Sequence, residues 1–433
     1  MLNKLKEILD KKSKRIIEYR RSFHQYPEVG WTEVRTASIV ASELTELGFS
    51  VALGRDVLKE EARLGLPTED VFNTTYARAV KEGADLEYAS FLKNGFTAVV
   101  GTLVCGDGPT IGMRFDLDAL PVDEIHEARH QPFEEGFVSE IKGVMHACGH
   151  DGHVAMGLGV AHLISELKDT FNGTYKLIFQ PAEEGVRGAK SMVEAGVLEG
   201  VDMLIGAHIG IVGDGSGTIY TGTCGFLATT KLDIRFKGTP SHAGVSPEKG
   251  QNALLAAATA ALQFHAIPRH SDGITRVNVG LLEAGSGRNV IPEHAHLMLE
   301  TRGGSSKLND YMLEQVMKIL EGVAIMYDVE VTVEEVGSAQ GACSDISFAE
   351  VIGDIADRLA CYKKVHTLYD RFSGCEDFTY MMNAIQDKGG QASYILLGTS
   401  LTAPHHNGLF DFKEADMLNG VLLLGSVAYE LGK

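Results

Sequence analysis

The sequence has little of what marks a membrane protein, a secreted precursor or a low-complexity chain. No apolar run reaches the roughly 18 residues that a membrane span requires. The segment 1–28 is charged throughout and lacks the apolar core of a signal peptide. Repeats and compositionally biased stretches are also missing. These absences exclude a transmembrane helix, leave no membrane partner to expect, and predict a cytoplasmic protein.

Paired cysteines and an excess of basic charge are missing as well. The six cysteines are scattered without paired spacing, at Cys105, Cys148, Cys224, Cys343, Cys361 and Cys375. In a chain this long we therefore expect no disulfide framework. Lys and Arg number 39 against 58 Asp and Glu, a formal net charge of −19. Because this balance opposes contact with phosphate backbones and no basic stripe offsets it, nucleic acid is excluded as a partner.

What is present predicts a two-domain α/β protein. At 433 residues, with 44% apolar and 22% charged residues, the chain is globular and too long for one ordinary core. Short apolar runs alternate with helical stretches over 1–227 and 339–433, which is typical of an α/β domain. Between 228 and 338 half-exposed strands and helices follow the order β-α-β-β-α-β, which predicts a small inserted α+β sandwich. The charged, helix-prone segment 54–96 is interpreted as a surface helical insertion.

Several of the buried-strand patterns end in ionisable residues. The runs "TIGMRF", "YKLIFQ", "VDMLIGA" and "ASYILLGTS" lead respectively to Asp116 and Asp118, to Glu183 and Glu184, to His208, and to His405 and His406. Binding sites of open α/β sheets form outside the carboxyl ends of the strands. We therefore expect these side chains to meet at one sheet edge. Asp116 is interpreted either as a solvated turn residue or as a group that orients a metal ligand.

The stretch "VMHACGHDGH" places Cys148 between His146 and His150, directly before an apolar helix pattern. The spacing predicts that Asp151 is the N-cap of that helix. Thiolate and imidazole are zinc ligands, which makes Cys148 and His150 candidate ligands. A cysteine with a histidine base also fits a thiol hydrolase, so a nucleophilic Cys148 is the alternative. His146 and His153 are expected to be structural or to support ligands.

Glu183 and Glu184 are adjacent, and neighbours in an extended backbone point to opposite sides. One carboxylate then binds a metal while the other takes a proton from water, which are the two functions that metal-assisted hydrolysis needs. Such a pair is more often a solvated loop, and a lone His208 is as often a buried structural histidine. The metal-site interpretation of this pair is favoured because the chain offers other donors, which suit zinc and tolerate manganese or cobalt. Those donors are Cys148, His150, His208 and one of His405 and His406.

Together, "VMHACGHDGH", "FQPAEEG", "GAHIG" and "HHNGLFDF" resemble, in the same order, the ligand motifs of the dinuclear-metal amidohydrolases of metallopeptidase family M20. The likeness continues through "MRFDLDALPV", "SHAGVSPEKGQNALL" and "GSGRNVIP", so it spans nearly the whole chain. It implies a hydrolase of the amide bond in N-acyl amino acids that uses two divalent metal ions, manganese or zinc, per subunit. It also implies a three-layer, zinc-peptidase-like domain with a central mixed sheet, and a ferredoxin-like lid that mediates dimerisation.

The resemblance implies roles for individual residues. Cys148 corresponds to a thiolate that bridges the two metals, where most other branches of the family use a carboxylate. Glu183 corresponds to the general base, and Asp116 to the aspartate that supports the ligand geometry. The implied metal ligands are Cys148, His150, Glu184, His208 and His406, with His405 as the alternative for the last position.

In the inserted domain, His242 corresponds to a histidine that stabilises the oxyanion, often from the partner chain. Asn289 and Arg302 correspond to residues that hold the substrate's carboxylate, a task suited to a guanidinium group. A closer likeness, carried by "KLIFQPAEEGVRGAKSMVEAGV", is to the branch that cleaves p-aminobenzoyl-glutamate and pairs with a related B-type subunit. The expected substrate is therefore p-aminobenzoyl-glutamate, with hippurate and N-acetyl amino acids as alternatives. The expected assembly is a homodimer or a heterodimer, and a chain that is active only with its partner is a further alternative.

Overall fold

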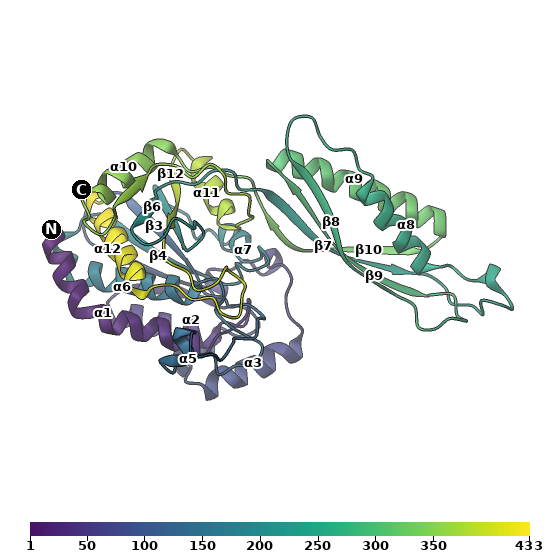
Figure 1. Ribbon diagram of the computed structural model, residues 1–433, viewed down its shortest axis with the longest axis horizontal. Helices are drawn as coiled ribbons and strands as arrows, with labels where there is room; N and C mark the ends of the chain where they lie inside the picture. Colours follow the sequence, from purple (N-terminus) through teal and green to yellow (C-terminus); the bar gives the residue numbers. More distant parts are fainter. The chain divides into compact units, whose positions relative to one another are not determined.

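The computed structural model describes residues 1–433, and its contacts divide the chain into two compact units (Figure 1). The larger unit consists of Met1–Cys224, Cys343–Phe372 and Tyr380–Lys433, and the smaller one of Gly225–Ala342 and Ser373–Thr379. The sequence predicts domain boundaries after residue 227 and before residue 339, whereas the contacts place them after 224 and before 343. The short second segment of the smaller unit has no local sequence pattern that marks it.

The larger unit is built on an eight-stranded sheet in the order β1-β2-β4-β3-β5-β12-β6-β11. Its strands are β1 (Ser50–Leu53), β2 (Val99–Val104), β3 (Thr110–Asp116), β4 (Thr174–Gln180), β5 (Met203–Ile209), β6 (Thr218–Tyr220), β11 (Lys364–His366) and β12 (Gln391–Leu397). The central strands β4, β3, β5 and β12 run parallel, whereas β2 is antiparallel to β1 and β4, and β6 is antiparallel to β12. The mixed sheet predicted for this fold is confirmed.

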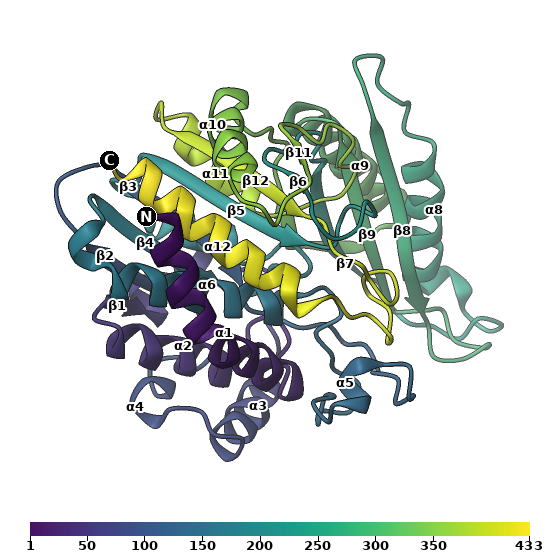
Figure 2. The ribbon, with the colours of Figure 1, turned by 60° about the vertical axis from the view of Figure 1, so that its left-hand side comes forward.

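This part of the chain also forms helices. They are α1 (Leu2–Gln25), α2 (Val34–Glu46), α5 (Gln131–Glu134), α6 (His150–Glu166), α7 (Ala189–Glu194), α10 (Ile346–Asp357), α11 (Phe378–Gln386) and α12 (Glu414–Leu431). Helices α1, α6 and α12 pack against one another, and Figure 2 shows them together on one face of the sheet. Leu5, Leu9 and Ile16 of α1 are buried, so an apolar stripe of this helix faces the core. No helix combines the length and the hydropathy that crossing a membrane requires.

The segment 54–96 contains only helical elements. The short turns η1 (Gly54–Asp56) and η2 (Glu60–Ala62) are followed by α3 (Glu69–Lys81) and α4 (Leu86–Ala89). In α3 only Ala79 is buried, which fits the charged composition of this segment. A helix with so little buried surface gains little from packing, so its polar residues suit a position at the surface.

The local prediction for the start of α6 was wrong. The helix begins at His150, and its N-cap is Gly149, whose φ of 92° is readily reached only by glycine. Asp151 lies in the first turn, is fully buried, and pairs with Arg20 at 3.0 Å and with His24 at 2.9 Å. A buried guanidinium requires a carboxylate partner. Because Arg20 lies far from Asp151 in the sequence, local spacing did not indicate this ion pair.

The smaller unit is a four-stranded antiparallel sheet with two helices. Its elements follow the chain as β7 (Ala228–Lys237), η4 (Pro247–Lys249), α8 (Ala253–His265), β8 (Thr275–Ala284), β9 (His294–Gly303), α9 (Ser306–Tyr327) and β10 (Glu330–Ala339). The sheet order is β10-β7-β9-β8. This confirms the predicted β-α-β-β-α-β order, and the two central strands β7 and β9 give the ferredoxin-like arrangement.

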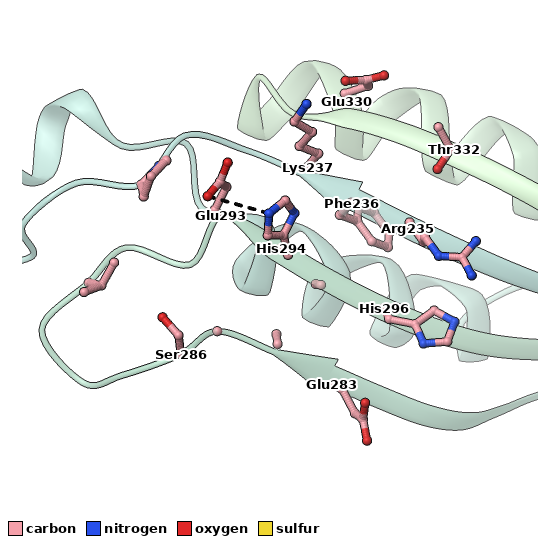
Figure 3. Close-up of a pocket in the computed structure, with 15 residues that line it drawn as sticks. Arg235, Phe236, Lys237, Glu283, Ser286, Glu293, His294, His296, Glu330 and Thr332 are labelled. Atoms are coloured by element: carbon pink, nitrogen blue, oxygen red, sulfur yellow. Dashed lines mark ion pairs between the residues drawn. The ribbon is translucent and has the colours of Figure 1, made fainter. Parts of the chain in front are cut away.

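One face of this sheet is open. Along β9, Ala295, Leu297, Leu299 and Thr301 are buried, whereas the alternating residues are partly or fully exposed. The helices α8 and α9 cover the buried face (Figure 1). Near the start of β9 the open face carries a cavity of about 600 Å³, in which charged side chains of both signs line the strands (Figure 3). The period of two expected for half-exposed strands therefore leaves a polar surface on the smaller unit.

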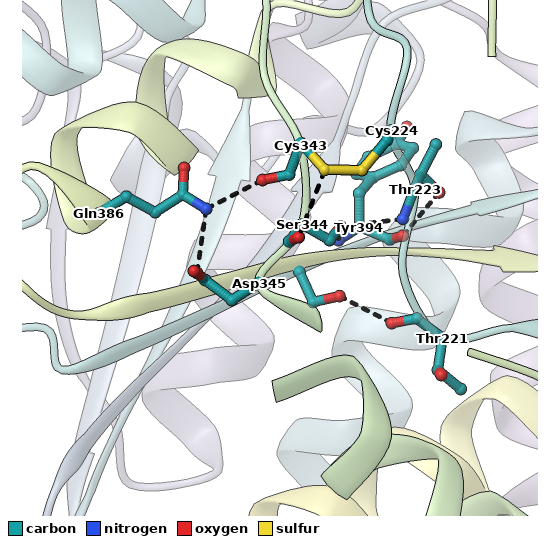
Figure 4. The surroundings of a disulfide bond; sticks show 9 residues. Thr221, Thr223, Cys224, Cys343, Ser344, Asp345, Gln386 and Tyr394 are labelled. Carbon is teal, nitrogen blue, oxygen red and sulfur yellow. Dashed lines mark hydrogen bonds between the residues drawn. A yellow bond between two sulfur atoms is a disulfide. The ribbon is translucent and has the colours of Figure 1, made fainter. Parts of the chain in front are cut away.

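The expectation of unpaired cysteines needs one correction. Cys224 and Cys343 form a disulfide, with their Cα atoms 4.2 Å apart (Figure 4). They also form an isolated antiparallel bridge, because the chain leaves the larger unit after Cys224 and re-enters it at Cys343. Their separation of 119 residues hides this pairing from any local spacing rule. The other four cysteines are free, Cys148 among them.

Candidate metal centre

The side chains predicted to form the site follow the carboxyl ends of neighbouring parallel strands. Asp116 ends β3, and Glu183 and Glu184 lie in the loop after β4. His208 lies at the end of β5, and His406 follows the adjacent strand β12. The sheet thus delivers acidic and imidazole groups from four strands to one edge, as expected for an open α/β sheet.

Cys148 and His150 reach the same edge from the loop that leads into α6. His150 donates its Nδ1 hydrogen to the backbone oxygen of Asp118 at 2.8 Å, and its buried Nε2 has no hydrogen-bond partner. His208 donates from Nδ1 to the backbone oxygen of Ile209 at 2.8 Å, and its Nε2 lies 3.5 Å from Cys148 Sγ. Backbone carbonyls therefore orient both rings so that their Nε2 lone pairs are available to a cation.

The donor atoms fall into overlapping groups. Those of Cys148, His150 and His208 lie within 4.8 Å of one another, and so do those of Cys148, Glu184 and His406. Glu184 Oε1, like His150 Nε2, is buried without a hydrogen-bond partner. Orphaned polar atoms are costly in a protein interior, and a cation would satisfy both. The donor set therefore fits two divalent metal ions, and the Cys148 sulfur belongs to both donor groups.

The two adjacent histidines have different surroundings. His406 Nε2 lies 3.4 Å from Glu184 Oε1, inside the second donor group. The Nε2 of His405 instead lies 3.2 Å from the backbone oxygen of Ile209, and its ring packs on Phe410 with centroids 4.7 Å apart. The backbone of His406 adopts a positive φ of 63°, a conformation that costs energy outside glycine. The geometry thus places His406 with the donor set, and His405 beside it.

The protonation of the donors reflects their burial and their neighbours. Burial raises the pKa of the Cys148 thiol, and the Glu184 carboxylate acts in the same direction. Burial lowers the pKa of His208 well below its ordinary value, so that its imidazole is neutral at pH 7. The neighbouring Cys148 and Glu184 raise the pKa of His406 to about 10. A divalent cation would compete with these protons for the same lone pairs, so binding should release protons.

Asp116 lies behind the donors. Its carboxylate contacts His153 Nδ1 at 2.5 Å and accepts a hydrogen bond from Arg114 Nη1 at 2.6 Å, and all three side chains are buried. Burial favours the protonated acid, but His150, His153 and Arg114 together hold the pKa of Asp116 well below its ordinary value. His153 Nε2 in turn accepts the backbone N–H of Ile209 at 3.0 Å. Asp116 therefore orders the layer beneath the donors.

The loop that carries Glu183 and Glu184 is held by acids that the motif analysis did not single out for this task. Asp118 accepts the backbone N–H groups of Glu183 at 3.0 Å and of Glu184 at 2.9 Å. Glu33 accepts the N–H of Ala182 at 2.8 Å and the hydroxyl of Thr97 at 2.6 Å. The spacing of Asp118 after Asp116 at a strand end was a visible signal. Glu33 lies too far away in the sequence to give one.

Glu33 and Asp118 together form a clamp on this loop. The clamp changes the directions in which the side chains of the two glutamates were expected to point. Ala182 adopts a positive φ of 51°, and the N–H of Val186 bonds back to the oxygen of Glu183 at 2.7 Å, so the backbone turns instead of extending. As a result, oxygen atoms of both Glu183 and Glu184 lie within 4.8 Å of a His150 ring nitrogen. The predicted divergence to opposite sides was wrong, because it assumes an extended strand.

We expect Glu33→Leu to lower the free energy of unfolding by about 1–3 kcal/mol, because it leaves buried donors on Ala182 and Thr97 without an acceptor. Burial and the nearby Asp118 raise the pKa of Glu33, which favours the protonated carboxylic acid. Glu33→Gln retains an acceptor and a donor, and is the matched control with a smaller loss. Urea unfolding at pH 7 measures both; a stability of Glu33→Leu equal to that of the native protein would contradict the clamp.

The residues expected to contact substrate from the smaller unit lie in two places. His242 and Asn289 belong to paired loops, since the N–H of Ala243 bonds to the backbone oxygen of Asn289 at 3.0 Å. Both side chains are exposed. Arg302 lies near the far end of β9, where its Nε and Nη2 bond to Glu300 at 3.0 and 3.2 Å. The structure therefore brings His242 and Asn289 together and leaves Arg302 apart from them.

Comparison with known proteins identifies the family. Residues 112–430 match the model of Peptidase family M20/M25/M40. The chain belongs to this family. It is 44% identical over 428 residues to a p-aminobenzoyl-glutamate hydrolase subunit of Escherichia coli (strain K12), covering 99% of this chain and 98% of that protein. It is also 44% identical over 412 residues to the indole-3-acetyl-aspartic acid hydrolase of Enterobacter agglomerans, with coverages of 95% and 94%.

The structural comparison agrees. The crystal structure of an aminobenzoyl-glutamate utilization protein from Klebsiella pneumoniae matches with a TM-score of 0.86 at 39% identity, covering 98% of both chains. The family predicted from the ligand motifs is thereby confirmed. As a member of family M20, the protein is a metal-dependent amidohydrolase of N-acyl amino acids.

Proposed function

We propose that this family M20 enzyme cleaves p-aminobenzoyl-glutamate into p-aminobenzoate and glutamate. The similarity over nearly the full length to a p-aminobenzoyl-glutamate hydrolase supports this substrate. The equal identity to an indole-3-acetyl-aspartic acid hydrolase supports a second candidate, an acyl-aspartate. Both substrates are amides in which an aromatic acyl group is joined to an acidic amino acid, so the proposal covers a single chemical class.

In the proposed mechanism two divalent ions, manganese or zinc, would be held by Cys148, His150, Glu184, His208 and His406. The observation that carries this assignment is the pair of overlapping donor groups with two buried, unpartnered donor atoms. Bound metal supplies a Lewis acid that polarises the amide carbonyl and makes water acidic enough to lose a proton near neutral pH. The remaining steps fall to the side chains of the protein.

Glu183 is proposed as the general base. It belongs to a donor group with His150 and Glu184 but, unlike Glu184, to none with Cys148 and His406, which suits a carboxylate at the edge of the centre. Glu183 removes a proton from the attacking water and later delivers it to the departing amine nitrogen. Asp118 fixes the backbone of Glu183, and Asp116 keeps the histidines beneath the centre in position.

His242, Asn289 and Arg302 are proposed to bind substrate. The three residues of one chain do not, however, contact the same substrate molecule. Asn289 precedes β9 and Arg302 lies near its end, and at about 3.4 Å per residue the strand separates them by roughly 27 Å. A substrate no longer than a tripeptide spans at most about 11 Å. We therefore propose that His242 and Asn289 serve the site of a second protomer, where His242 stabilises the oxyanion.

The partner is proposed to be a second copy of this chain or a related B-type chain. The p-aminobenzoyl-glutamate hydrolase that resembles this chain is named as one subunit of its enzyme, which supports a related second chain. If His242 acts across an interface, dilution of the enzyme to monomers should abolish turnover. Activity and sedimentation measured over the same concentration range provide the check. A fully active monomer would refute the placement of His242 in a partner's site.

The experiment that tests the function is an assay of the purified chain with manganese or zinc on a panel of N-acyl amino acids. The panel contains p-aminobenzoyl-glutamate, indole-3-acetyl-aspartate, hippurate and N-acetyl amino acids. Highest kcat/KM on the first compound supports the proposal, and repetition with a related B-type subunit shows whether the chain needs a partner. Chelation should abolish turnover. Resistance to chelation combined with inactivation by thiol alkylation would instead favour a nucleophilic Cys148.

A further inference from the structure

A second cavity, of about 320 Å³, lies on the open face of the four-stranded sheet, away from the one shown in Figure 3. It is lined by three guanidinium groups, from Arg269, Arg276 and Arg302, and by a single carboxylate, that of Glu300. These charged groups give the lining a formal charge of +2. The whole protein carries −19, so this concentration of positive charge opposes the general trend of its surface.

Two of the arginines face each other across neighbouring strands. Arg276 on β8 is paired in register with Arg302 on β9, and Asn278 is paired with Glu300. Side chains directly opposite in an antiparallel pair lie about 4.5–5.5 Å apart at Cβ, and like charges in this position destabilise the sheet. An arginine placed there is therefore better explained by a bound anion than by the stability of the fold.

Only one of the three guanidinium groups has its charge compensated. Glu300 binds Arg302 through Nε and Nη2, which orients that guanidinium and leaves Nη1 outside the pair. Arg276 and Arg269 have no carboxylate within ion-pair distance, and Lys231, in register with Glu300 on β7, adds a further cation. The cavity of Figure 3, by contrast, is lined by three carboxylates, those of Glu283, Glu293 and Glu330, and by only two permanent cations, Arg235 and Lys237.

We infer that Arg276, with Arg269 beside it, binds the second carboxylate of an acidic amino acid, while Arg302 binds the first. This inference rests on the proposed function and adds to it the side chain that recognises the acidic amine half. The two carboxylates of such a residue match the +2 of the lining residues, among which Lys231 is not counted, and each arginine fork can hold one of them through two parallel hydrogen bonds. A neutral amino acid would leave Arg276 and Arg269 without a counter-charge. Arg276 thereby selects acyl-glutamate and acyl-aspartate over other N-acyl amino acids.

The test compares p-aminobenzoyl-glutamate with p-aminobenzoyl-glutamine, which differ only in the second carboxylate. We expect Arg276→Gln to lower kcat/KM for the glutamate substrate by roughly 10- to 100-fold and to leave the glutamine substrate within about twofold. Arg276→Lys keeps the charge but loses the fork, so its kcat/KM for the glutamate substrate should lie between those of the native protein and Arg276→Gln. Arg235→Gln is the matched control, because it removes the same charge from the same sheet face outside this cavity. Equal losses on both substrates, or no loss on glutamate, would overturn the inference.

A binding measurement separates this inference from the proposed function. Calorimetric titration with free glutamate and free glutamine requires no turnover. If native protein cleaves no N-acyl amino acid, the proposed function fails, yet preferential glutamate binding that Arg276→Gln abolishes would still support the arginine site. If native protein hydrolyses the panel but binds glutamate and glutamine equally, the function stands and the arginine site is rejected.

Discussion

Replacing Glu183 by glutamine is expected to lower kcat by roughly 10²- to 10⁴-fold, the range that loss of a general base produces. Glutamine has nearly the same shape, so the backbone hydrogen bond from Glu183 to Asp118 and the turn to Val186 should persist. The amide cannot take a proton from water or return it to the amine. The loss should therefore appear in kcat, with KM little changed.

The metal content of the variant shows whether Glu183 acts as a base or as a metal ligand. Because Glu183 is proposed as a base and not as a ligand, Glu183→Gln should retain both ions by elemental analysis. Glu184→Gln is the matched comparison: it alters the adjacent carboxylate, which lies 3.4 Å from His406 in the second donor group, and should lose metal. Native turnover in Glu183→Gln would reject its role, and metal loss equal to that of Glu184→Gln would make Glu183 a ligand.

Replacing Cys148 by alanine is expected to lower metal occupancy below two ions per chain and to reduce turnover by roughly 100-fold or more. The reason is geometric, since the Cys148 sulfur belongs to both the group with His150 and His208 and the group with Glu184 and His406. Removing it takes a donor from each ion at once. The sulfur also lies 3.5 Å from His208 Nε2, so its loss leaves that nitrogen without its neighbour.

Cys148→Asp is the informative control for this prediction. A carboxylate bridges the metals in most other branches of the family, as the motif resemblance implies, so aspartate should recover part of the metal binding and activity that alanine loses. Cys148→Ala with two bound ions and native turnover would exclude a bridging role. Activity in Cys148→Asp would separately exclude a thiol nucleophile, because an aspartate cannot replace a cysteine in thiol chemistry.

The candidate metal centre could be predicted from the sequence because its donors follow recognisable buried strands. "YKLIFQ" and "VDMLIGA" became β4 and β5, and Glu184 and His208 lie at their ends as expected. The order of strands and helices between 228 and 338 was equally accessible, because alternating and helical periodicities are local. In both cases the information lies within a short stretch of neighbouring residues.

Two predictions that depended on the local shape of the backbone were wrong. The opposite orientation of Glu183 and Glu184 assumed an extended chain, and the positive φ of Ala182 overturned it. The N-cap expected at Asp151 failed because a buried Arg20 from α1 takes that carboxylate. In each case a partner from a distant part of the chain outweighed the local preference.

The sequence by itself determined the family, the two kinds of domain, and the residue types that a two-metal hydrolase needs. Only the tertiary structure decided which of His405 and His406 points towards Glu184, and that Glu33 and Asp118 clamp the loop of Glu183 and Glu184. It also decided that Arg276 stands opposite Arg302. The physical reason is that ligand types follow from local chemistry. Pairing of buried acids, cysteines and arginines depends instead on strand order and register, which bring together residues far apart in the chain.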